Sequence, residues 1–184
     1  MSSSTIDPAG PWRFDDLVGL PDDGRRYEVV DGHLVVTPPP SQDHQLVAGR
    51  LREQLGAACP PDWEVVQEYA LPLGSDGRVP DLAVVRRRAL SGGTTPYPQG
   101  PEDFGMVVEI SSPSTRKTDL FAKPGEYAEA GIPLFWRVDL QPELAVHPFR
   151  LHPDGYAPVD LRARAWPVPW GAVGLHLRRL VTGR

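Results

Sequence analysis

Two short apolar segments, each with one carboxylate at or near its end, constrain the fold of this chain more than any other feature. Met106-Val107-Val108-Glu109-Ile110 is typical of a buried strand with an acid near its end, and Asp81 begins another apolar run, Leu82 to Val85. An ionised carboxylate at the boundary of a core is costly unless it is paired, hydrogen-bonded or bound to a metal. Neighbouring strands would bring the two acids together, and a divalent cation would relieve their repulsion. Ligation by oxygen alone favours magnesium or manganese over zinc.

Each acid also has a simpler interpretation. Asp81 follows Pro80 and could be a turn residue, while Glu109 could form a salt bridge with an arginine. Taken singly, each alternative is about as good as the functional one. Both acids lie at expected strand ends. When they are considered together, a shared functional site is therefore favoured over the two separate structural roles.

Lys123 is the third candidate for the site. We expect a helix from about Asp119 to Ala130, on which Asp119, Lys123 and Tyr127 share one face. From that face a lysine could orient a water and offset developing phosphate charge. The alternative is a surface ion pair with Asp119 or Glu126.

Two further polar residues belong to the N-terminal part of the chain. Glu28 lies in an expected hairpin, Tyr27 to Val36, whose Asp31-Gly32 pair suits a tight turn, and it could bind a metal or face solvent. His44 begins an expected helix that continues to Ala58. It could contact phosphate or assist proton transfer, and a simple position at the helix start is a slightly better interpretation.

The order of the expected elements indicates the fold class. After the hairpin and the helix come strands over residues 63–71, 79–85 and 106–110, the second helix, and strands over 134–139 and 143–151. This order predicts an α/β (α+β) fold in which a central mixed sheet is flanked by helices. We expect a single domain over residues 12–184 and a flexible N-terminal arm over residues 1–11.

The composition limits the class of protein. A net charge of -5 gives no support to a strongly basic nucleic-acid binder, although a local basic face could still contact phosphate. A single cysteine excludes an internal disulfide framework. The sequence has no secretory signal and no apolar run long enough for a bilayer, so we expect a cytoplasmic protein without a membrane segment. It also lacks a phosphate-binding glycine loop, a nucleophile elbow and zinc-spaced cysteines and histidines.

Several strings, in a fixed order, carry a family resemblance. They are Arg26 to Val35, Pro38 to Gln45, Val79 to Leu82, Val107 to Thr115, and the residues from Asp119 through Tyr127 to Asp139. Together they resemble the Uma-type putative restriction endonuclease family of the PD-(D/E)XK nuclease superfamily, which is frequent in bacteria. The resemblance runs from about Trp12 to Tyr156, and its order and spacing make it specific.

The resemblance implies a restriction-endonuclease-like core that hydrolyses DNA phosphodiester bonds with magnesium or manganese. It assigns Asp81 and Glu109 as the acids of the motif. Ser111 stands where the superfamily has a lysine, and the resemblance implies that Lys123 replaces it. The backbone carbonyl of Ile110 is then a further metal ligand.

The remaining residues of the site have supporting roles in this assignment. Glu28 would complete the metal site, and His44, Asp119 and Tyr127 would be accessory residues. Such nucleases often act as dimers, so a homodimer is a possible assembly. The alternatives are a non-catalytic nucleic-acid or protein-binding module that retains the fold, and a phosphoesterase acting on RNA or a nucleotide.

Overall fold

The computed structural model describes residues 10–90, 100–111, 122–160 and 165–182. Its first elements are a 3₁₀ helix, η1 (Phe14–Gly19), and the hairpin of β1 (Arg26–Val30) and β2 (His33–Thr37). Asp31 and Gly32 connect these strands with φ values of 50° and 71°, which the tight turn requires. The hairpin predicted from the sequence is therefore confirmed.

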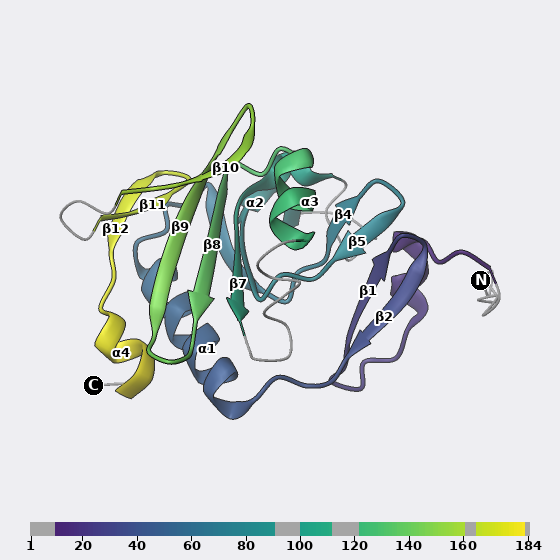
Figure 1. Cartoon of the computed structure of the whole chain (residues 1–184), viewed down its shortest axis with the longest axis horizontal. Coiled ribbons are helices and arrows are strands. Elements are labelled where there is room, and N and C mark those ends of the chain that lie inside the picture. Colours follow the sequence, from purple (N-terminus) through teal and green to yellow (C-terminus); the bar gives the residue numbers. More distant parts are fainter. Residues whose placement is uncertain (1–9, 91–99, 112–121, 161–164, 183–184) are drawn as a thin grey trace.

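A six-stranded sheet forms the centre of the fold (Figure 1). β7 and β8 run parallel and the other neighbours run antiparallel, so the sheet is mixed as predicted. In spatial order the strands are β10 (Gly155–Pro158), β9 (Ala145–His152), β8 (Leu134–Asp139), β7 (Phe104–Ser111), β6 (Leu82–Arg86) and β3 (Trp63–Gln67).

A second, four-stranded sheet has the order β2-β1-β5-β4 and contains the hairpin. The sequence predicted one strand over residues 63–71, and this prediction is wrong. Glu68 has a φ of 49°, which interrupts the extended backbone after β3. The chain then enters the smaller sheet as β4 (Leu71–Leu73) and turns back as β5 (Asp76–Arg78), a strand that the sequence did not predict.

Helices cover the two faces of the central sheet. α1 (Gln42–Ala57) packs on one face with α4 (Leu177–Thr182), over the side chains of Val84, Met106 and Val108. α3 (Lys123–Glu129) covers the other face, where Tyr127 packs with Val107. The alternation of side chains along β7 therefore divides the core into two layers. The remaining elements are α2 (Arg87–Leu90), η2 (Pro101–Asp103), β11 (Ala165–Val168) and β12 (Gly171–Gly174).

α1 and α3 both begin next to site residues, and each start has a known helix-initiating residue. Ser41 caps α1, and its hydroxyl accepts a hydrogen bond from the backbone N–H of His44 at 3.4 Å. α3 begins at Lys123, so Pro124 lies in its first turn, where the missing N–H costs no helical hydrogen bond. Asp119 and the residues around it lie outside the described part of the chain.

Within the described ranges, no helix is both long enough and apolar enough to cross a membrane.

Candidate active site

The two acids of the sequence analysis lie at the same end of the central sheet. Leu82 pairs with Val108 in the antiparallel ladder of β6 and β7, so the next position brings Asp81 opposite Glu109. The Oδ2 atom of Asp81 accepts a hydrogen bond from the backbone N–H of Ile110 at 2.6 Å. Asp81 is 3% exposed and Glu109 is 1% exposed. The structure thus places one buried carboxylate just before β6 and the other in the neighbouring strand β7, at facing positions. The strand expected over residues 79–85 begins only at Leu82.

α3 supplies two partners for Glu109. Lys123 Nζ donates to Glu109 Oε2 at 3.0 Å, and the Tyr127 hydroxyl donates to Glu109 Oε1 at 2.5 Å. Lys123 and Tyr127 are one helical turn apart, so both reach the same strand. Burial, together with the charge of Glu109, raises the pKa of Tyr127 well above its ordinary value. The phenol therefore stays protonated and can hold the carboxylate by donation.

Glu28 joins the same cluster from β1. Its Oε1 atom accepts a hydrogen bond from the Val79 N–H at 2.9 Å and lies 3.8 Å from Lys123 Nζ. Its Oε2 atom accepts from Arg78 Nη1 at 3.3 Å. Glu28 is buried, so it does not take the solvent-facing role that the sequence left open. Lys123 consequently lies between two carboxylates, those of Glu109 and Glu28.

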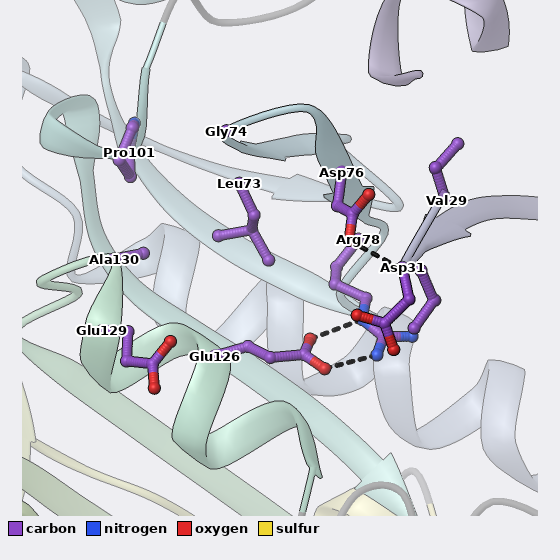
Figure 2. Close-up of a pocket in the computed structure, with 11 residues that line it drawn as sticks. Val29, Asp31, Leu73, Gly74, Asp76, Arg78, Pro101, Glu126, Glu129 and Ala130 are labelled. Atoms are coloured by element: carbon purple, nitrogen blue, oxygen red, sulfur yellow. Dashed lines mark hydrogen bonds and ion pairs between the residues drawn. The ribbon is translucent and has the colours of Figure 1, made fainter. Parts of the chain in front are cut away.

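Arg78 connects this cluster to a surface pocket. Its Nε and Nη2 atoms form a fork with the carboxylate of Glu126, with both donor–acceptor distances at 2.6 Å (Figure 2). The pocket has a volume of about 380 Å³, and Arg78 and Glu126 both line it. Asp81, Glu109 and Lys123 are not among its lining residues, so the pocket adjoins the site without containing it.

Asp81 is held by two basic side chains. His44 Nε2 lies 3.1 Å from its Oδ2 atom, and Arg26 Nη2 donates to its Oδ1 atom at 2.6 Å. Burial alone would raise the pKa of Asp81, but the hydrogen bond from His44 and the positive charge of Arg26 lower it to about 2. Asp81 is therefore ionised at neutral pH.

The structure brings His44 into the site, although the sequence slightly favoured a plain helix-start role. Arg26 and Arg78 were missed as site residues. A signal for Arg26 was present, because it stands two residues before Glu28, just ahead of the expected hairpin strand, and would share the face of Glu28 if that strand began one residue earlier, as the observed β1 does. Arg78 had no local signal, since the strand β5 that carries it was not expected.

The cluster offers oxygen ligands to a divalent cation. Carboxylate oxygens are the donors that magnesium and manganese prefer. Among the described residues, the buried atoms Arg26 Nε, His44 Nδ1 and Ser111 Oγ have no hydrogen-bond partner. The donor types and these unsatisfied atoms fit a site that binds a further polar group.

Both carboxylates already have protein donors. Asp81 and Glu109 each accept hydrogen bonds at both carboxylate oxygens. No group of three or more His, Cys, Asp or Glu residues with metal-binding geometry exists among the residues described. A bound cation would therefore have to replace some of the present contacts.

The sequence matches the family profile of Uma2, described as "Putative restriction endonuclease", over residues 14–177. The chain belongs to the Uma2 family. The match covers well over half of the chain and confirms the resemblance seen in the motifs. The family description supports a nuclease-type hydrolase.

A solved structure is similar throughout. It is the crystal structure of a putative nuclease belonging to DUF820 from Anabaena variabilis ATCC 29413, with a TM-score of 0.75 and 18% sequence identity. The similarity covers 94% of this chain and 98% of that chain, which confirms the fold class. Among curated proteins, no relative matches this sequence.

Proposed function

We propose that this chain is a divalent-metal-dependent endonuclease that hydrolyses phosphodiester bonds of DNA. One observation carries the proposal: a buried acid just before β6, a buried acid in β7 and a buried lysine from α3 lie at one end of the sheet. Asp81 lies opposite Glu109, and Lys123 Nζ is 3.0 Å from Glu109 Oε2. Membership of a restriction-endonuclease family supports the same chemistry.

The acids are the residues that would hold the metal, magnesium or manganese. Asp81 and Glu109 are the principal ligands in this proposal, with the Ile110 carbonyl and Glu28 as further ligands. A bound divalent ion would stabilise charge on the scissile phosphate and lower the pKa of a bound water. Glu28 is suited to a supporting role, because it is buried and already fixed by the Val79 N–H at 2.9 Å.

Lys123 is the proposed group that acts on water and phosphate. Its ammonium can donate a hydrogen bond to the attacking water and offset negative charge on the phosphate. Glu109 and Glu28 hold it from two sides, at 3.0 Å and 3.8 Å. Tyr127 fixes the orientation of Glu109, and His44 fixes that of Asp81. These contacts keep the reacting groups in place before the substrate arrives.

A cleavage assay tests the proposal. Purified wild type, Glu109→Gln and Glu129→Gln are incubated with plasmid and oligonucleotide DNA in magnesium, manganese or EDTA. Glu129 is an exposed acid on the same helix as Lys123, so its variant controls for loss of one charge. We expect cleavage by wild type and Glu129→Gln, and a loss of about a hundredfold or more in Glu109→Gln. Cleavage that persists in EDTA or in Glu109→Gln rejects the assignment.

A second candidate is a binding module that retains the fold without catalysis. It is favoured by one observation, that Asp81 and Glu109 already accept hydrogen bonds from protein groups at both oxygens. This candidate predicts that neither metal supports cleavage of any nucleic acid. It also predicts that Asp81→Asn binds DNA as wild type does in a gel-shift or anisotropy titration. The homodimer is a prediction of the proposed nuclease, and light scattering on the full chain would test it.

A further inference from the structure

Arg26 lies between the buried carboxylate of Asp81 and the protein surface. It lies on β1 and reaches Asp81, which is 55 residues further along the chain. Its Nη2 atom is 2.6 Å from Asp81 Oδ1 and 3.0 Å from Glu68 Oε1. The side chain of Asp81 is 3% exposed and that of Glu68 is 54% exposed, with Arg26 between them at 14%. The guanidinium therefore bridges an interior carboxylate and a carboxylate at the surface.

The hydrogen bonding of Arg26 differs from that of the other arginine in the cluster. Arg78 uses Nε and Nη2 in a fork with Glu126 and Nη1 for Glu28. Arg26 uses Nη2 for both of its carboxylate partners, and its buried Nε–H has no partner within the part of the chain that the structure describes. A buried donor without a partner is costly, so the present position of Arg26 is held by fewer hydrogen bonds and at a greater desolvation cost than that of Arg78.

The atom that Arg26 contacts is the atom that a metal would need. Oδ2 of Asp81 already accepts a hydrogen bond from Ile110 N–H and lies 3.1 Å from His44 Nε2, so a metal at Asp81 would have to bind through Oδ1, the oxygen that Arg26 contacts. Burial alone lowers the pKa of Arg26, but the charges of Asp81 and Glu109 raise it well above its ordinary value. Arg26 is thus a permanent cation within the electrostatic field of both proposed metal ligands.

We propose that Arg26 is a built-in counter-cation that a divalent metal must displace from Asp81 Oδ1. The guanidinium keeps the acid pair neutralised when no metal is bound, and it competes with the metal for the same oxygen. Glu68 already lies 3.0 Å from Nη2, so the displaced guanidinium keeps a carboxylate partner near the surface. The inference rests on the proposed metal-dependent function and assigns Arg26 as the residue that sets metal affinity.

Direct metal titration tests this assignment without measuring cleavage. Free Mn²⁺ is followed by electron paramagnetic resonance during titration of the full-length wild type, Arg26→Gln, Arg26→Lys, Asp81→Asn and Arg25→Gln. Arg25 is exposed and pairs with Asp23 at 3.4 Å, which makes it a matched control on the adjacent residue. Thermal unfolding with and without Mn²⁺ verifies that each variant folds.

The proposal predicts a distinct Mn²⁺ affinity for each variant. Removal of one competing buried charge should tighten Mn²⁺ binding about tenfold in Arg26→Gln. Arg26→Lys and Arg25→Gln should bind as wild type does, and Asp81→Asn should lose binding. The Mn²⁺-induced rise in unfolding temperature should be larger in Arg26→Gln than in wild type.

The outcomes separate the two proposals. The wild type could bind Mn²⁺ through Asp81 while Arg26→Gln binds Mn²⁺ equally well or more weakly. That result would reject the role of Arg26 as a competitor of the metal, but it would leave the nuclease proposal intact. If neither wild type nor Arg26→Gln binds Mn²⁺, both proposals fall.

Discussion

Replacement of Lys123 by methionine removes the ammonium from a buried charge cluster. Lys123 is 5% exposed, and its Nζ lies 3.0 Å from Glu109 and 3.8 Å from Glu28. Loss of one partner from a buried ion pair costs about 3–5 kcal/mol of unfolding free energy, because a carboxylate is left buried beside another. For a chain of 184 residues, about 2–4 °C per kcal/mol corresponds to a fall in Tm on the order of 10 °C.

The double variant Lys123→Met with Glu109→Gln tests the cause. Glutamine keeps the volume of the side chain and can still accept the hydrogen bond from Tyr127, but it carries no charge. The cost of the double variant should fall short of the sum of the single costs by about 1–3 kcal/mol. Glu129→Gln, on the exposed side of the same helix, should change the unfolding free energy by less than about 0.5 kcal/mol.

Urea unfolding followed by circular dichroism, in EDTA, measures these free energies. The reasoning is refuted if Lys123→Met costs less than about 1 kcal/mol, or if the costs of the two single substitutions add without coupling.

Three further predictions concern other parts of the same structure. Tyr127→Phe removes the donor to Glu109 Oε1 and should lower the unfolding free energy, measured in urea, by about 1.5–3 kcal/mol. It should also lower the rate of DNA cleavage about tenfold, because Glu109 loses the group that positions it. An unchanged cleavage rate would contradict this positioning role. The pKa of Asp81 is about 2 in the folded protein and 3.8 in the unfolded chain. Ionised Asp81 therefore stabilises the folded protein by about 2 kcal/mol above pH 4, and this contribution is lost as the pH falls to about 2. Acid unfolding of metal-free Asp81→Asn should lack this component, and equal acid sensitivity of the two proteins would argue against it. A Cβ atom at Gly105 would lie 2.6 Å from Trp63 and 2.6 Å from Pro169, so Gly105→Ala should lower the unfolding free energy by about 1–3 kcal/mol; calorimetry that shows no loss would refute the close approach.

Local patterns in the sequence were sufficient for the elements whose physics is local. The Asp31-Gly32 pair specified the hairpin because the tight turn needs positive φ at both positions. Ser41 and the helical spacing of apolar residues specified α1 within two residues of its observed start. The candidates Asp81 and Glu109 were found from local patterns too, since a charge at the edge of an apolar run needs a compensating partner. Lys123 was found from the helix face that it shares with Asp119 and Tyr127 and from the family resemblance.

Only the tertiary structure decided which partners those charges have. Arg26 reaches Asp81 across 55 residues, and Arg78 reaches Glu28 across 50. No local propensity contains such a contact, because it depends on how the small sheet of β1 and β5 packs against the end of the central sheet. The positive φ of Glu68, which redirects the chain from one sheet to the other, was hidden for the same reason. Turn conformation and helix or strand periodicity depend on neighbouring residues and can be inferred from the sequence. The partners of buried charges are determined only when distant segments pack together.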